Sequence, residues 1–161
     1  MASPGAEGAP VRPAVALALA VVGFFALAIF GLGMMTLIGD AEVIPVRGLS
    51  QIPGAIGMAL ATAAFAGALW WGLRWPHPSF WNALIAALAA YLGEVLGVLL
   101  GALGSGADPA LAVSAAGSVA IGWAGAVIAA AALLAGWCGV GLVRTHAHRP
   151  RWPWERDDPD E

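Results

Sequence analysis

The chain has 161 residues, of which 60% are hydrophobic and only 11% are charged. A soluble domain normally carries about 25% charged residues, so the composition argues against a water-soluble fold. The length allows one domain and leaves no room for a separate soluble catalytic domain, because apolar segments take up most of the residues.

Four apolar segments are each long enough to cross a bilayer as a helix, which takes roughly 20 mostly apolar residues. They are too long for membrane strands and lack strand alternation, so we predict helices rather than a β-barrel. The expected fold is an all-α integral membrane four-helix bundle within residues 14–143, arranged as two antiparallel hairpins. Its spans are expected at about residues 15–38, 52–73, 80–103 and 111–143.

The first span is longer than the apolar core of a signal peptide, about 7–15 residues, and no clear cleavage site follows it. We therefore expect it to be retained as a membrane helix. The small, proline-containing residues 1–13 are expected to form a disordered cytoplasmic N-terminus, and residues 144–161 a cytoplasmic tail.

Local signals mark the boundaries between the spans. Ser50 and Ser79 are candidate N-caps of the second and third helices, and the Trp-Pro-His-Pro turn at 75–78 forces these helices into a hairpin. Asp108 followed by Pro109 is typical of a helix start. The fourth helix is thus expected to run for about 30 residues or more, which requires it to tilt, kink or project from the bilayer. The sequence leaves its continuity open.

Arginines set the expected orientation, because the cytoplasmic flanks of membrane helices carry an excess of basic residues. All seven basic residues of the chain are arginines, and only Arg47 falls on the side opposite the termini. The others lie on the side of the termini: Arg12, Arg74, Arg144, Arg149, Arg151 and Arg156. We therefore predict a multi-pass protein of the plasma membrane with both termini in the cytoplasm.

The tryptophans indicate the same polarity, because indole prefers the headgroup level of a bilayer. Trp123 is the exception. The others fall near the predicted cytoplasmic face: Trp70, Trp71, Trp75, Trp81, Trp137, Trp152 and Trp154. We interpret those in or beside the spans, together with Arg144, as interface anchors. Trp152 and Trp154 are either further anchors or solvated in the tail.

The third span carries a glycine at every fourth position, at Gly93, Gly97 and Gly101, which places all three on one face. Helices in a bilayer associate through close contact of small residues, since burying apolar surface against lipid gains little. We expect this ridge to mediate helix–helix contact, either within the bundle or by self-association between protomers. The sequence does not identify the partner helix.

Glu94 is the one carboxylate inside a span, close to the middle of the third helix. At about 100° per residue it lies about 60° from Gly97 and about 60° from Tyr91, so it faces the packed side rather than lipid. Burial without a cation penalises the charged form, so we expect Glu94 to be protonated at neutral pH. The protonated carboxyl group could then donate a hydrogen bond to Thr36, Thr62, Ser118, the backbone beside Trp123, or another carbonyl.

Glu94, with Tyr91 beside it, has two candidate roles. It is either the proton-binding or cation-binding site of a small exchanger, or a neutral hydrogen-bonding residue that fixes the register of the helices. The lone Cys138 is interpreted as a small buried hydrophobic residue.

The sequence contains no nucleophile beside a base, no phosphate-binding loop and no metalloprotease motif. We interpret His77, His146 and His148 as interfacial rather than as metal ligands, because they lack second-shell support. We therefore predict no enzymatic activity, no cofactor, no metal site and no nucleic-acid partner.

The Ala-, Gly- and Val-rich spans, the absence of lysine and the Arg-Trp-Pro-Trp-Glu segment at 151–155 resemble uncharacterised four-helix membrane proteins of high-GC actinobacteria. This resemblance implies no particular activity. Small multidrug-resistance exporters carry their membrane glutamate in the first helix, and rotary-ATPase proteolipids carry theirs beside extended glycine repeats, so both patterns differ from this chain.

We predict a non-enzymatic membrane protein, structural or accessory to a larger membrane complex, because the spans hold few polar groups from which to build a substrate pathway. The alternative is a small proton-coupled transporter or channel that uses Glu94 and acts as a homo-oligomer. Both hypotheses require the lipid bilayer as a partner. The sequence indicates neither a substrate nor an oligomeric state.

Overall fold

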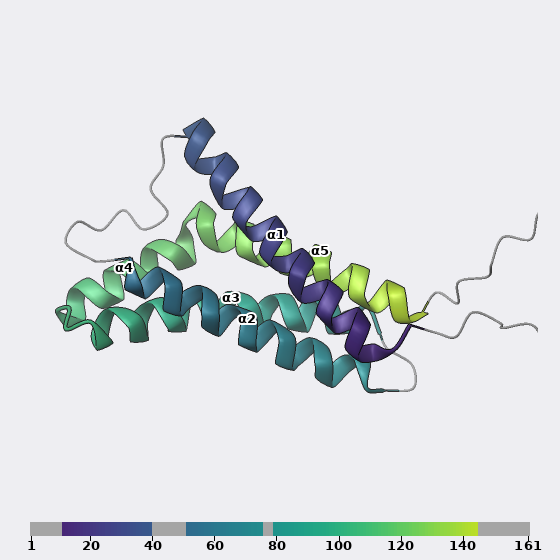
Figure 1. Ribbon diagram of the computed structural model, residues 1–161. Coiled ribbons are helices and arrows are strands. Elements are labelled where there is room, and N and C mark those ends of the chain that lie inside the picture. The colour runs from purple at the N-terminus through teal and green to yellow at the C-terminus, as the bar shows by residue number, and fades with distance from the viewer. Residues whose placement is uncertain (1–10, 40–50, 76–78, 145–161) are drawn as a thin grey trace, which may run out of the picture.

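The computed structural model describes residues 11–39, 51–75 and 79–144. These residues form helices and turns, and no strand occurs among them, which confirms the predicted all-α class. The remaining residues, which include most of both predicted tails, lie outside the description. The helices are α1 (Pro13–Gly39), α2 (Ile52–Leu73), α3 (Trp81–Gly104), α4 (Pro109–Ile121) and α5 (Trp123–Arg144) (Figure 1).

Four of these helices are long and apolar enough to cross a membrane, namely α1, α2, α3 and α5. The remaining helix, α4, has 13 residues. At 1.5 Å per residue it is about 20 Å long, too short to cross a hydrocarbon core of about 30 Å alone. The described residues therefore contain four helices that could span a membrane, as the sequence predicts.

The fourth predicted segment is two helices rather than one. Gly122 has φ −80° and ψ 170°, an extended conformation that interrupts the helical path between α4 and α5. Of the outcomes expected for so long a segment, the structure thus shows a kink, and it lies at a glycine, a common cause of kinks. The expected early start is confirmed, because Asp108 accepts a hydrogen bond from the backbone N–H of Ala110 at 2.8 Å and Pro109 follows it.

The boundaries of α3 also have local causes. Ser79, its predicted cap, precedes the N-cap residue Phe80 and accepts a hydrogen bond from the backbone N–H of Trp81 at 3.3 Å. At the other end, Gly106 has φ 83°, in the left-handed region that glycine tolerates best, and it turns the chain after α3. Ser50, the predicted cap of α2, lies outside the described residues.

The two helices α2 and α3 are antiparallel and in close contact along their lengths. From one contact to the next, residue numbers rise along α2 and fall along α3. The contacts join Pro53 with Gly101, Gly57 with Gly97, Ala61 with Gly93, and Gly72 with Asn82. A hydrogen bond of 3.3 Å from the side-chain amide of Asn82 to the carbonyl oxygen of Gly72 ties the end of α2 to the start of α3.

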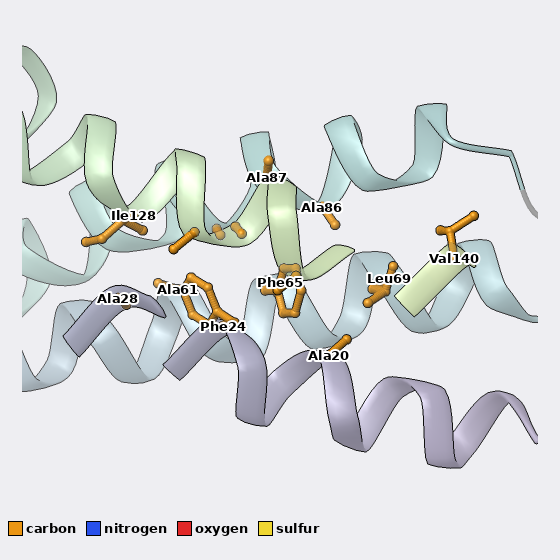
Figure 2. Close-up of a cluster of buried hydrophobic side chains, with 14 of the residues drawn as sticks. Ala20, Phe24, Ala28, Ala61, Phe65, Leu69, Ala86, Ala87, Ile128 and Val140 are labelled. Carbon is orange, nitrogen blue, oxygen red and sulfur yellow. The ribbon is translucent and has the colours of Figure 1, made fainter. Parts of the chain in front are cut away.

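The largest buried cluster forms where α1, α2, α3 and α5 meet. Phe24 of α1 and Phe65 of α2 stack at its centre, with ring centroids 4.9 Å apart (Figure 2). Ile128 and Val140 enter it from α5. Most of the other members are alanines, which bring the helix axes close together. They include Ala20, Ala28, Ala61, Ala86, Ala87 and Ala132.

The helices differ in how far they pack. In Figure 1, α1 crosses the other helices obliquely and its C-terminal end stands apart from them, where Leu37 and Ile38 are exposed. The start of α1 and the end of α5 lie at the same end of the molecule, because Gly139 contacts Ala16 and Ala20. The end of α2 and the start of α3 lie at this end too, since the guanidinium of Arg144 covers the ring of Phe80.

Cys138 is exposed, so its interpretation as a buried residue is wrong. The neighbouring positions of α5 that contact other helices are Gly136 and Gly139, which meet Ala83 and Ala20 respectively. Cys138 is thus turned away from both neighbours, on an outer face of α5.

Candidate functional site

Glu94 lies near the middle of α3 and is only 6% exposed, and no other polar side chain among the described residues is as buried. Its carboxyl group lies over Gly57 of α2. A Cβ atom added to Gly57 would be 2.8 Å from Oε1 and 3.1 Å from Cδ of Glu94. The missing side chain of Gly57 therefore leaves the space that the carboxyl group occupies.

The three ridge glycines of α3 hold this carboxyl group against α2. At the middle one, Gly97, an added Cβ atom would lie 2.6 Å from the Cα atom of Gly57 and 2.9 Å from the carbonyl oxygen of Ile56. Gly93 and Gly101 meet backbone atoms of α2 in the same way. Backbone atoms cannot swing aside as a side chain can, so α3 reaches α2 only because these positions are glycine. The ridge was expected to pack either within the bundle or between protomers, and the structure shows the contact within the chain.

The carboxyl group of Glu94 has no hydrogen-bond partner among the described residues, and its buried Oε2 atom is unsatisfied. The expected hydrogen bonds to hydroxyl groups are therefore wrong. In a helix, serine and threonine hydroxyls reach the carbonyls of the preceding turn, and these do so. Each donates within its own helix: Thr36 to Gly33 (2.8 Å), Thr62 to Met58 (2.7 Å) and Ser118 to Ala115 (2.7 Å).

Tyr91, one turn before Glu94, contacts the break between α4 and α5. Its hydroxyl donates a hydrogen bond of 2.8 Å to the carbonyl oxygen of Ala120. In an uninterrupted helix this carbonyl would accept from the backbone N–H of Ala124, and the extended Gly122 removes that partner. The tyrosine therefore satisfies a backbone group that the break leaves without its helical partner.

Gly125 fits the first turn of α5 against the ring of Tyr91. An added Cβ atom there would meet the carbonyl oxygen of Val119 and lie 3.0 Å from Cε2 of Tyr91. Sequence reasoning did not identify Gly125, and it treated Gly122 as a small residue for helix packing rather than as the position of a break. Their only signal is a pair of closely spaced glycines in a segment longer than a single span requires.

The predicted interface anchors lie at one end of the molecule and are largely exposed. Trp71, Trp75, Trp81 and Trp137 are 71%, 60%, 72% and 57% exposed. Trp70 is less exposed, and the guanidinium of Arg74 lies 5.8 Å from the centre of its ring.

Glu94 offers one carboxyl group, which can hold a proton or form part of the shell of a monovalent cation. The described residues contain no group of three or more histidine, cysteine, aspartate or glutamate side chains placed to bind a metal ion. The three histidines interpreted from the sequence as interfacial, His77, His146 and His148, lie outside the described residues. Glu94 and Tyr91 lie one turn apart on α3, and their contacts reach α2 and the α4–α5 break respectively.

The sequence model of a protein family described as "Family of unknown function (DUF6121)" matches residues 11–161. The chain belongs to this family. The DUF6121 match includes every residue that the structure describes, so α1 to α5 and Glu94 all lie within the family region. No curated protein and no solved structure matches the chain. The DUF6121 description states neither a source nor a number of spans, so the resemblance to actinobacterial membrane proteins stays a prediction.

Proposed function

We propose that the chain is a non-enzymatic integral protein of the plasma membrane, built as two antiparallel hairpins with both termini in the cytoplasm. The four long apolar helices support the location. The charges at the helix ends support the orientation, because Arg12, Arg74 and Arg144 lie at the end of the molecule that holds the start of α1. Asp108 lies at the opposite end, where α3 connects to α4.

We further propose that the protein is a small proton-coupled carrier in which Glu94 binds the proton. The observation that carries this proposal is the buried carboxyl group with no hydrogen-bond partner among the described residues. A carboxyl group in the middle of a membrane helix costs several kcal/mol, roughly 2.5–3.5 kcal/mol on insertion scales. A group retained at this cost without a structural partner is best explained by a ligand, and the smallest is a proton.

The register-fixing role is the less favoured of the two roles of Glu94. That role requires a hydrogen bond from Glu94 to another helix, and the described residues supply none. The register of α2 and α3 is instead set by contacts of Gly93, Gly97 and Gly101 with backbone atoms. Removal of the ionisable group should therefore change proton binding and leave packing intact.

Glu94→Gln tests this proposal, because glutamine has nearly the same shape and cannot ionise. The protein is reconstituted in liposomes that contain a pH-sensitive dye, and proton flux is driven by a potassium diffusion potential. We expect flux through the native protein and its loss in Glu94→Gln, with the thermal midpoint of unfolding unchanged. Equal flux in both proteins, or no flux in the native protein under any imposed proton or cation gradient, contradicts the proposal.

Gly57→Ala separates the position of the carboxyl group from its chemistry. The added methyl group would lie 2.8 Å from Oε1 of Glu94, so the carboxyl group must move although it stays ionisable. We expect proton flux to fall, and the infrared band of the protonated carboxyl group, assigned through Glu94→Gln, to shift. Gly67→Ala is the matched control on α2, because an added Cβ atom there meets nothing within 4 Å.

The accessory function keeps support from one observation on the outer face of α2. Ala55, Ala59, Ala63 and Gly67 are exposed and recur at every fourth position, a pattern through which membrane helices contact other proteins. Purification of the full chain from its native membranes in mild detergent distinguishes the two functions. A stoichiometric partner that is lost on substitution of Ala63 by leucine favours the accessory function, and a lone homo-oligomer with Glu94-dependent flux favours the carrier.

A further inference from the structure

The described basic residues gather at one end of the molecule. Arg12 precedes α1, Arg74 follows α2, and Arg144 ends α5. The described acidic residues lie elsewhere: Glu94 in the middle of α3 and Asp108 at the start of α4. This end of the described chain is therefore positively charged without a compensating carboxylate.

The two arginines at the C-terminal ends of helices, Arg74 and Arg144, lie against aromatic rings. The guanidinium carbon of Arg144 lies 4.8 Å from the ring centre of Phe80, and that of Arg74 lies 5.8 Å from the ring centre of Trp70. A ring covers one face of a guanidinium and leaves the N–H groups at its edge available as donors. Neither arginine pairs with a carboxylate among the described residues. Each thus keeps guanidinium N–H donors available, and the planar fork of these donors matches the geometry of a phosphate group.

The surrounding side chains indicate where such a phosphate would lie. Trp137 of α5 packs edge-on against Phe80, with centroids 5.8 Å apart, so Trp137 and Arg144 share one ring. Trp81, next to Phe80 in the chain, and Trp71, next to Trp70, are 72% and 71% exposed. Exposed tryptophans at the end of an apolar helix place this end at the headgroup level of a bilayer. These rings would contact the apolar part of a lipid beside its phosphate, whereas a free phosphate ion has no such part.

We propose that this end of the molecule, formed by Arg74, Arg144, Phe80 and Trp137, binds the phosphate headgroup of an anionic phospholipid. The inference relies on the proposed membrane location and is independent of the role of Glu94. The guanidinium edges bind the phosphate oxygens, and the indole ring packs beside the glycerol region. Anionic lipids of the cytoplasmic leaflet are the occupants that this charge selects.

A different explanation for the arginines is that they complement the negative ends of helix dipoles, since Arg74 directly follows α2 and Arg144 lies in the last turn of α5. That explanation predicts no preference among lipids. The two explanations are separated by Arg144→Lys, which keeps the charge but removes the planar fork and its stacking on Phe80.

The test uses the full chain in mild detergent and measures bound lipid by native mass spectrometry, with phosphatidylglycerol and phosphatidylcholine as probes. We expect phosphatidylglycerol to bind more tightly than phosphatidylcholine. Each basic residue near an anionic surface contributes roughly fivefold in binding, so Arg74→Gln with Arg144→Gln should together lower phosphatidylglycerol binding about 25-fold. Arg144→Lys should also lower it, though less than Arg144→Gln, because lysine keeps the charge and loses only the planar fork and the contact with Phe80. Glu94→Gln is the control and should bind lipid like the native protein.

Three results would overturn the proposal. Unchanged phosphatidylglycerol binding in the protein that carries both Arg74→Gln and Arg144→Gln would show that these arginines do not bind the lipid. Native-like binding by Arg144→Lys, with loss only in Arg144→Gln, would show that surface charge alone attracts the lipid and that the planar guanidinium forms no specific site. Displacement of the lipid by inorganic phosphate at equal concentration assigns the arginines to a free phosphate. Each single variant is accepted only if its thermal midpoint matches that of the native protein, so that misfolding cannot imitate loss of binding.

Discussion

The helix α3 contacts its neighbours through two faces, and the two faces make different kinds of contact. Towards α2, the glycines Gly93, Gly97 and Gly101 remove side chains so that two regular helices touch through their backbones. Towards α4 and α5, α3 meets a helix that is interrupted at Gly122, and there Tyr91 adds a hydroxyl group. The first face allows close packing because it lacks side chains, and the second supplies a hydrogen-bond donor.

This difference follows from what each partner offers. A regular helix has no unpaired backbone groups in its interior, so only distance limits how closely another helix can pack. An interrupted helix leaves a carbonyl without its partner, and a polar side chain must replace it. The carboxyl group of Glu94 lies between these cases: it sits on the regular face, over Gly57, and no described group satisfies it.

The largest expected effect concerns the backbone contact with α2. Gly97→Ala would place a Cβ atom 2.6 Å from the Cα atom of Gly57, and neither backbone can give way. Overpacking of this kind costs about 1–3 kcal/mol, and we expect the upper end of that range. Titration of the purified protein with SDS in mixed micelles measures the free energy of unfolding.

Gly67→Ala is the control for this measurement, since it lies on the open face of α2. Alanine is the better helix former by about 0.5–1 kcal/mol, so this variant should be slightly more stable than the native protein. Destabilisation of both variants to the same degree would mean that the contact of Gly97 with α2 is not what holds the two helices.

A smaller effect is expected on the other face of α3. Gly125→Ala would bring a methyl group against the carbonyl oxygen of Val119 and to 3.0 Å from the Tyr91 ring. The carbonyl oxygen of Val119 is a backbone atom, but it belongs to the last turn of α4 at the break, which can shift more easily than the interior of two packed helices. We therefore expect a loss of about 1–2 kcal/mol, below that of Gly97→Ala. Hydrogen exchange of residues 119–126 should rise. A loss as large as that of Gly97→Ala would show that the break is as rigid as the glycine contact.

The sequence predicted the helices well because their ends have local causes. Asp108 with Pro109 marks the start of α4, and Gly106 the turn before it. The break at Gly122 could not be predicted, because glycine alone does not determine it. Gly117 remains helical within α4, while Gly122 is extended and faces a region where Tyr91 supplies the missing partner. That tyrosine is distant in sequence, so the local pattern contains no trace of the contact.

The candidate site was predictable in position but not in its contacts. Glu94 stands out as a lone carboxylate in an apolar segment, and its angular relation to Gly97 correctly placed it on a packed side. Its position over Gly57 required the pairing of α2 with α3, and alanine-rich helices offer several faces of equal appearance for such pairing. The expected hydrogen bonds failed because hydroxyls such as that of Thr62 bond within their own helix.

The smallest expected effect isolates the hydrogen bond at the break. Tyr91→Phe keeps the ring beside Gly125 and removes only the donor to the carbonyl oxygen of Ala120. Hydrogen bonds between membrane helices contribute about 0.6 kcal/mol on average, and we expect a loss of this size in the same SDS titration. Hydrogen exchange should rise near residues 120–124 and stay unchanged in α2. Thr62→Val is the matched control, because the carbonyl of Met58 keeps its helical partner when the threonine hydroxyl is lost. If Thr62→Val costs as much as Tyr91→Phe, the tyrosine hydroxyl does not replace a missing helical bond, and the contrast between the two faces of α3 reduces to their glycines.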